Sequence, residues 1–402
     1  MIIKSFNNTL SKDNLQINEK LNSIIEEKLE KTLILAKSLD DWEGILNRFK
    51  ISNKKIIAAR SSSILKQKYP NIYVEEYITK KRTYSTSAFF RKDFFTKGIY
   101  EWFIKEEDLL LWLYRAYEWS KDLEQVKKIR VASINYDLYV KLTNKILIAK
   151  ILKISTDAKY DFNTPSIFFE YANKLTLPFV VSAQVSDGGD GVFFIKNFED
   201  FKKATSKIST PIIKLQKYLK GDSYNIMGVI FNDCIVAYQP SKQIIEIEDN
   251  NFKFKGSDFK IDLKEDIKNK MLNTFFKIAN ELKNLNYIGI FGCDFIVNND
   301  EIYFIELNPR FQASSFILNY PEGLNPYIAH ILAFSDCKLK KLINDCDNIY
   351  IEFENLRYHY FRYIKNYDEA NKIIREKGRG EIRAVPQDFE IEDGAPWGFL
   401  IY

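Results

Sequence analysis

Two acidic residues and a nearby amide carry the clearest chemical signal in the sequence. Asp294 and Glu306 lie on either side of Asn299-Asp300-Glu301, which is typical of a three-residue hairpin loop between two strands of alternating apolar residues. This register places Asp294 opposite Glu306, and the alternation of side chains adds Asn308 and Phe304 to the same face. Carboxylates that face each other repel unless a cation lies between them. Two carboxylates and an amide oxygen suit Mg²⁺, so we prefer a metal site to a solvated hairpin with incidental acids.

Several polar residues follow this hairpin. Arg310 comes directly after Asn308-Pro309, and its planar guanidinium can present paired donors to a carboxylate or to phosphate oxygens. Gln312 and Ser314 either contact a substrate or cap a helix, and both alternatives stay open. Farther along, Arg357 and Arg362 can bind an acid substrate, although a solvated strand face explains them equally well.

A second signal is the glycine-rich stretch Ser186-Asp-Gly188-Gly189-Asp-Gly191. Only 15 of the 402 residues are glycine, yet three of them lie within four positions here. Glycines in a turn allow backbone N–H groups to approach phosphate oxygens closely, although a tight turn between two strands needs glycine as well. No Gly-Lys-Ser/Thr follows, and no strand-linked Gly-x-Gly-x-x-Gly is present, which argues against a Walker loop and a Rossmann dinucleotide site.

Composition excludes other classes of function. The net charge of +5 is spread along the chain, so a nucleic-acid partner is not expected, and no apolar run is long enough to span a membrane. The first residues lack the features of a secretory signal, which predicts a cytoplasmic protein. The four cysteines have no Cys-x-x-Cys spacing, and of the two histidines His330 is expected to be a packed core residue. Carboxylates and cations must therefore carry any catalysis.

The elements that position these residues can be predicted from periodicity. A chain of 402 residues suggests two or three domains. Apolar positions from Leu21 to Leu35 predict amphipathic helices, and the pattern then predicts a strand–helix–strand unit. The expected strands are 55–59, 72–77, 129–134, 178–181, 192–195, 212–218, 226–231, 234–238, 289–308 as a hairpin, and 358–363; the expected helices are 61–69, 108–127, 144–153, from Glu199, 264–285 and 368–377.

The hairpin and the glycine-rich stretch together resemble the ATP-grasp superfamily over about residues 140 to 318. The resemblance implies an α/β fold with three parts. These are an N-terminal α/β domain with a helical extension at 1–140, a small lid lobe at 141–211, and a larger antiparallel-sheet lobe with a C-terminal α/β extension at 212–402.

The resemblance also implies the roles of individual residues. Asp294, Glu306 and Asn308 would coordinate two Mg²⁺ ions, with Mn²⁺ as an alternative metal, while Arg310 would hold an acyl phosphate; Glu306, Asn308 and Arg310 are the expected catalytic residues. The implied ATP contacts are Lys145, Ser182, Gln184, Gly188, Gly189, Gly191, Gln216, Lys217, Tyr218, Leu219 and Asp222.

One position departs from the family pattern. Ser182 stands where a second ATP-contacting lysine is expected, and Lys145, Lys214 or Arg310 would have to compensate. Lys253, Lys255 and Lys260 are expected only to solubilise the surface.

The implied activity is that of a ligase that uses ATP to activate a carboxylic acid, such as an amino acid, as an acyl phosphate. An amine then attacks, and ADP and phosphate are released. The motifs look most like those of stand-alone ligases of natural-product pathways. Two alternatives stay open: a ligase that loads an amino acid onto a carrier-protein thiol, and a nucleotide-binding regulatory protein whose catalysis has decayed. The expected partners are small-molecule acid and amine substrates, joined by a carrier protein in the first alternative, and a homodimer is left open.

Overall fold

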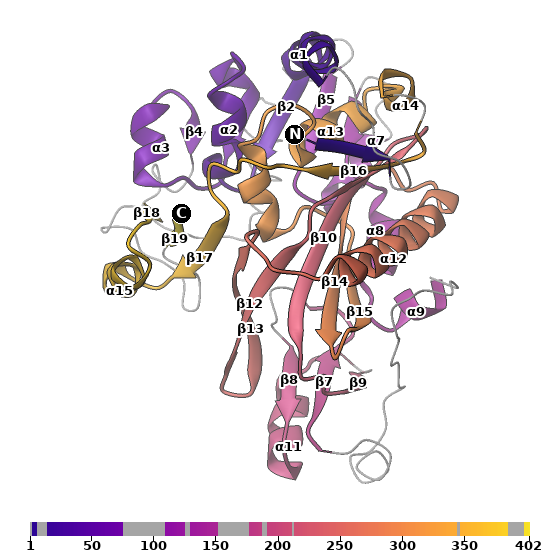
Figure 1. Ribbon diagram of the computed structural model, residues 1–402, viewed down its shortest axis with the longest axis vertical. Coiled ribbons are helices and arrows are strands. Elements are labelled where there is room, and N and C mark those ends of the chain that lie inside the picture. The colour runs from indigo at the N-terminus through magenta and orange to yellow at the C-terminus, as the bar shows by residue number, and fades with distance from the viewer. Residues whose placement is uncertain are drawn as a thin grey trace.

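The computed structural model describes residues 2–5, 14–74, 109–124, 129–151, 177–186, 191–210, 213–343, 346–384 and 398–402. Within these ranges the strands form two sheets (Figure 1). The smaller sheet is entirely parallel, and its order is β4 (Tyr73–Val74), β3 (Ile56–Ala58), β2 (Thr32–Ala36), β5 (Leu109–Leu113) and β6 (Ile129–Ala132). Helices accompany it at α1 (Asn14–Glu30), η1 (Leu39–Trp42), α2 (Glu43–Leu46), η2 (Asn53–Lys55), α3 (Ser63–Lys68), η3 (Glu118–Ser120) and α7 (Lys121–Glu124).

The parallel sheet contains two errors of the secondary-structure prediction. Leu33 and Leu35 were expected on a helix but lie in β2, and the helix expected over 108–127 is the strand β5 followed by two short helices. All five residues of each strand are buried. A parallel strand covered on both faces is a continuous apolar run, which periodicity cannot distinguish from a buried helix. The strands expected at 55–59 and 129–134 and the helix at 61–69 are confirmed.

The larger sheet is mostly antiparallel and has a long central path with two branches. The path runs β1 (Ile2–Ser5), β16 (Asn348–Glu352), β11 (Ile235–Tyr238), β10 (Asp222–Ile230), β12 (Ser241–Glu248), β13 (Asn251–Asp258), β17 (Tyr360–Ile364), β19 (Gly398–Ile401) and β18 (Glu381–Ala384). One branch adds β14 (Gly289–Asn298) and β15 (Glu301–Asn308) to β10. The other adds β8 (Val192–Ile195), β7 (Phe179–Ala183) and β9 (Ile213–Lys217) to β13 through a single pairing of Asn251 with Phe193.

Helices cover the larger sheet and link it to the smaller one. The helix α12 (Glu265–Asn284) buries Phe275 against Phe291 of β14, with the rings stacked 4.6 Å apart. Gly228 of β10 leaves room for the same ring, since a Cβ there would overlap Phe275. The remaining helices are α8 (Tyr136–Thr143), α9 (Leu147–Ile151), α11 (Phe198–Lys207), η4 (Ala313–Asn319), α13 (Pro326–Ala333), α14 (Leu339–Leu342) and α15 (Tyr367–Lys377).

His330 on α13 joins the two sheets. Its Nδ1 accepts a hydrogen bond from the Ile290 N–H at 3.0 Å, so Nε2 carries the proton and donates to the Ala132 carbonyl at 2.8 Å. Ile290 lies in β14 and Ala132 ends β6. Burial lowers the pKa of His330 to about 4, which keeps the ring neutral. The prediction of a packed, satisfied core histidine is confirmed.

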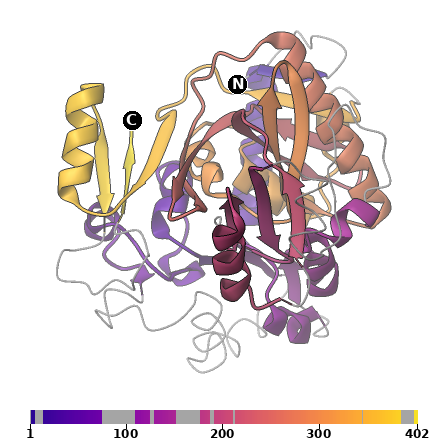
Figure 2. The ribbon, with the colours of Figure 1, turned by 90° about the horizontal axis from the view of Figure 1, so that it is seen from below.

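The three strands β7, β8 and β9, with α11, form a small layer that we call the lid. In Figure 1 the lid lies below the long strands β10, β14 and β15, at the opposite end from the parallel sheet, and Figure 2 shows α11 in front of the lid strands. Phe179, Val181 and Leu215 form its apolar interior. Gly188 and Gly189 lie outside the described residues, and Gly191 has a left-handed φ of 77° that favours glycine. The domain divisions expected at residues 140 and 211 stay predictions.

Candidate active site

Asp294 pairs with Glu306 across the hairpin as expected, but the turn and the register that produce this pairing differ from the prediction. Asn298 pairs with Glu301, so the loop has two residues, Asn299 and Asp300, whose φ values of 50° and 63° suit a tight hairpin turn. The expected three-residue loop is therefore wrong. The register then shifts between Asp294 and Phe295, where β15 has one extra residue. The shorter turn and the bulge cancel, and Asp294 pairs with Glu306.

The bulge also decides which side chains face the site. Phe295 pairs with Phe304 and Asp294 with Glu306, so Ile305 is the inserted residue. Ile305 lines the cleft beside Glu306, while Phe304 is buried in the core below with its ring 6.0 Å from that of Phe295. The prediction that Phe304 shares the acidic face is wrong, because the extra residue reverses the alternation before the acids.

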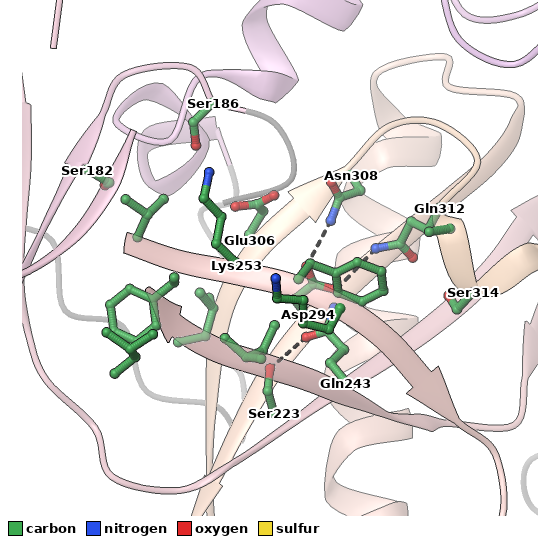
Figure 3. Close-up of a pocket in the computed structure, with 18 of the residues that line it drawn as sticks. Ser182, Ser186, Ser223, Gln243, Lys253, Asp294, Glu306, Asn308, Gln312 and Ser314 are labelled. Atoms are coloured by element: carbon green, nitrogen blue, oxygen red, sulfur yellow. Dashed lines mark hydrogen bonds between the residues drawn. The ribbon is translucent and has the colours of Figure 1, made fainter. Parts of the chain in front are cut away.

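Three amide side chains surround the carboxylate of Asp294, and Figure 3 shows two of them, Asn308 and Gln312. Asn225 and Gln312 donate to Oδ1 at 3.0 and 3.1 Å, and Asn308 donates to Oδ2 at 3.0 Å. Asn225 lies directly opposite Asp294 on β10, is 2% exposed, and accepts a hydrogen bond from the Ser314 hydroxyl at 3.0 Å. Burial, and next the nearby Glu306, raise the pKa of Asp294 to about 6, while the amide hydrogen bonds act in the opposite direction. The amides thus hold this carboxylate in one orientation.

A glycine makes this arrangement sterically available. Gly292 pairs with Asn308 across the hairpin, and the Gln312 side chain lies against its Cα. A Cβ at this position would overlap the Gln312 amide. Gly292 is therefore needed for Gln312 to reach Asp294.

Glu306 has a cationic partner. The Lys145 Nζ lies 2.6 Å from Glu306 Oε2, with the two side chains 11% and 22% exposed. The backbone N–H of Lys145 donates to the Gln184 carbonyl at 2.9 Å, so the end of β7 holds the lysine in place. The acid pair needs positive charge, and in this structure Lys145 supplies part of it.

The acid pair opens onto a cleft of about 950 Å³ between the lid, the β12–β13 hairpin and the strand ends of the parallel sheet. The predicted site residues that line it are Lys145, Ser182, Gln216, Lys217, Tyr218, Leu219, Asp294, Glu306, Asn308, Arg310, Gln312 and Ser314. They come from positions 145 to 314 in sequence.

Other predicted residues are not part of the cleft lining. Gln184 acts through its carbonyl on Lys145, and Gly191 ends the lid turn. Asp222 pairs with Lys242 at 2.8 Å. Arg362 pairs with Glu246 at 2.6 Å, and the Arg357 guanidinium lies over the rings of Tyr320 and Tyr358.

The cleft also contains cations that sequence reasoning missed. Lys253 and Lys255, expected only to solubilise the surface, both line it, together with Phe252 and Phe254 of the same strand β13. Lys255 is 13% exposed and lies 2.7 Å from Glu248. Figure 3 shows the Lys253 side chain extending toward the part of the cleft that holds Glu306. Without the β12–β13 pairing, their spacing alone gave no sign of a site.

Three further lining residues, Lys37, Arg60 and Tyr114, follow strands of the parallel sheet. They come after β2, β3 and β5 respectively, at the carboxyl ends where α/β sheets usually bind ligands. The Lys37 Nζ lies 5.2 Å from the centre of the Tyr114 ring. The erroneous helix over 108–127 concealed the end of β5, and with it Tyr114.

The donor set suits a hard divalent cation bound together with a ligand's own oxygens. Among the described residues, no group of three or more His, Cys, Asp or Glu side chains could hold a metal ion. The acid pair offers two carboxylates with the amide of Asn308 beside them. Mg²⁺ is typically bound by one or two carboxylates plus substrate phosphates, so these residues fit it in that form.

Comparison with known proteins gives one family match. Residues 143–314 match the ATP-grasp domain family, a range that includes Lys145, the acid pair and Ser314. A formate-dependent phosphoribosylglycinamide formyltransferase of Prochlorococcus marinus is 24% identical over 49% of this chain and 50% of its own length. A D-alanine–D-alanine ligase of Campylobacter jejuni is 25% identical over 34% of this chain and 41% of its own length. The chain thus spans about half or less of the length of these curated relatives.

Solved structures establish the fold. A carboxyaminoimidazole ribonucleotide synthase from Aspergillus clavatus, complexed with ATP, superposes with a TM-score of 0.63 at 14% identity, covering 93% of this chain and 94% of that one. The biotin carboxylase domain of a Hydrogenobacter thermophilus 2-oxoglutarate carboxylase gives 0.61 at 12% identity, covering 92% and 85%. The predicted α/β fold class is confirmed. No described helix is long and apolar enough to cross a membrane.

Proposed function

We propose that this chain, which carries an ATP-grasp domain over residues 143–314, is an ATP-dependent ligase that activates a carboxylic acid as an acyl phosphate and couples it to an amine. The observation that carries the proposal is the pairing of Asp294 with Glu306 at the wall of a large cationic cleft. The names of two relatives, a D-alanine–D-alanine ligase and a formate-dependent formyltransferase, each include a carboxylic acid as a reactant. A natural-product pathway and a carrier-protein thiol as acceptor stay predictions.

In this proposal Asp294, Glu306 and Asn308 would hold the Mg²⁺ that accompanies ATP. The metal would offset negative charge on the transferred phosphoryl group and on the leaving ADP. Asn225 and Gln312 fix the Asp294 carboxylate, and their hydrogen bonds favour its ionised form. Lys145 orients Glu306 through the ion pair between their side chains.

The adenine would lie near the strand β9 and the residues that follow it, Gln216 to Leu219. The Tyr218 ring packs 4.6 Å from Phe194 and 6.4 Å from Phe252, and the cleft lining includes the branched apolar side chains Val180, Val192, Ile245 and Ile247. Flat aromatic and branched aliphatic surfaces suit a planar base.

The acid substrate would lie at the other end of the cleft, near Arg310, Lys37 and Arg60. Asp41 lies near these cations: burial raises its pKa to about 6, while Arg60 and Lys37 act in the opposite direction. A substrate carboxylate attacks the γ-phosphorus, a new carboxylate O–P bond forms, and the bond to ADP breaks. The amine then attacks the acyl carbon and phosphate leaves, while Arg310 can donate two hydrogen bonds to the departing phosphate.

The proposal is tested by measuring ADP and phosphate release with ATP, Mg²⁺, a panel of amino acids and other carboxylic acids, and amine acceptors. We expect an acid-dependent release that Glu306→Gln reduces by about 100- to 1,000-fold, the range for removing one group that stabilises the transition state electrostatically. Glu301→Gln is the matched control, because Glu301 is exposed on the same hairpin. Binding of ATP without release for any acid would support the decayed regulatory protein instead. Equal release by Glu306→Gln and wild type would contradict the assigned site.

A further inference from the structure

A buried lysine faces the serine that departs from the family pattern. Lys214 of β9 pairs with Ser182 of β7 in the antiparallel lid. Residues directly opposite each other in such a pair project from the same face of the sheet. Lys214 is 3% and Ser182 6% exposed, and both line the cleft.

The alternation along both strands supports this placement. On β9, Lys214 and Gln216 line the cleft, whereas Leu215 between them is fully buried in the lid interior. On β7, Val180 and Ser182 line the cleft, whereas Val181 belongs to the same interior. The Lys214 side chain therefore leaves the lid on the face where a lysine at position 182 would also leave it.

The charge of the cleft indicates what such a lysine would contact. Nine basic and four acidic side chains line the cleft, a difference of five positive charges. The basic ones are Lys37, Arg60, Lys145, Lys214, Lys217, Lys253, Lys255, Arg310 and Lys365, and the acidic ones are Glu248, Asp294, Glu306 and Glu369. A ligand with several negative charges, such as a nucleotide polyphosphate, complements this excess of positive charge.

We infer that Lys214 supplies the phosphate-contacting cation of the lid, so that the charge missing at Ser182 has moved to the neighbouring strand. This inference rests on the proposed nucleotide site. It makes β9 a strand that serves both ends of the nucleotide, since Lys214 would contact the phosphates and the residues from Gln216 onward would contact the base. The serine at 182 then leaves space for the lysine that faces it.

Calorimetric titration of the full chain with ATP, ADP and AMP, each with Mg²⁺, tests the inference. We expect Lys214→Met to weaken ATP and ADP binding by about 10- to 100-fold, the range of a charge-assisted hydrogen bond, and to change AMP binding by less than about threefold. Lys203→Met, at an exposed position on α11 in the same lid, should leave all three affinities unchanged. Thermal melting of each variant monitors folding.

A reciprocal exchange separates a phosphate contact from a structural role. The double variant Ser182→Lys with Lys214→Ser should recover ATP affinity to within a few-fold of wild type, because the cation returns to the same face of the lid. The inference is overturned if Lys214→Met loses AMP and ATP affinity equally, or if its ATP affinity equals that of the wild type. If the ATP affinity of Lys214→Met is unchanged and the wild type still releases ADP, the inference about Lys214 fails and the proposed function remains. Absence of ATP binding by the wild type overturns both.

Discussion

Two clusters of buried acids in this protein have opposite arrangements of their partners. In the cleft, the Asp294–Glu306 pair has one close lysine and three neutral amides, and it opens toward a large space. Between the parallel sheet and β18, Asp40 and Glu43 are instead closed in with Arg383.

The second cluster contains its own buried cation. The Arg383 guanidinium lies 2.8 Å from Glu43 and 2.6 Å from Glu381, and it is 2% exposed. Glu43 also accepts from the Tyr320 hydroxyl at 2.8 Å, and Asp40 accepts from the Ser62 backbone N–H at 2.8 Å. A buried acid near a matching guanidinium therefore supports the fold, whereas facing acids with unneutralised charge in a cleft indicate a binding site.

The largest effect on stability is expected from Arg383→Met. Removing the guanidinium leaves Asp40 and Glu43 buried without their cation, so we expect the free energy of unfolding to fall by about 3–5 kcal/mol. Chemical denaturation measures it, and Arg379→Met, at an exposed position before the same strand, is the control. If the free energy of unfolding falls by less than about 1 kcal/mol, Arg383 does not stabilise the fold by neutralising Asp40 and Glu43.

His330 is a third kind of buried titratable group, because both of its hydrogen-bond partners are neutral backbone groups. Its pKa is about 4 in the folded chain against an ordinary 6.5, so the unfolded chain binds more protons between these values. The stabilisation is complete above pH 6.5, is lost as the pH falls toward 4, and amounts to about 3 kcal/mol. Urea denaturation at several pH values should show that His330→Asn lacks this part of the acid destabilisation and that His359→Asn keeps it. An unchanged pH dependence in His330→Asn would contradict the assignment.

A smaller effect is expected from Gly292→Ala, which tests how the neutral amides act in the cleft. The added methyl group overlaps Gln312 and must displace it from Asp294. We expect about 1–3 kcal/mol of destabilisation from overpacking, together with about a tenfold loss of ADP release. Adding Gln312→Ala should restore stability but not activity. Full activity in Gly292→Ala would mean that Gln312 does not position the carboxylate.

The local parts of the site were predictable from sequence, and its long-range parts were not. Asp294 and Glu306 belong to one hairpin, so alternation and a turn were enough to place them opposite each other. Even there two errors cancelled, since the turn has one residue fewer than expected and Ile305 adds one.

The contacts that sequence reasoning missed depend on pairings between distant segments. Asn225 meets Asp294 only because β10 pairs with β14, and Lys214 meets Ser182 only because β9 pairs with β7. Lys37 and Tyr114 follow strands that are buried on both faces, whose apolar runs were mistaken for helices. In each case the residue type was visible in the sequence, while its neighbour was determined by sheet topology.

The most direct test of the central claim is the dependence of nucleotide affinity on Mg²⁺. ADP binding is titrated with and without millimolar Mg²⁺ for the wild type and for the double variant Asp294→Asn with Glu306→Gln, which has lost both carboxylates. We predict that Mg²⁺ tightens binding by at least about tenfold in the wild type and has little effect in the variant, since the metal would bridge the acid pair and the phosphates. An equal effect of Mg²⁺ on both proteins would contradict the account.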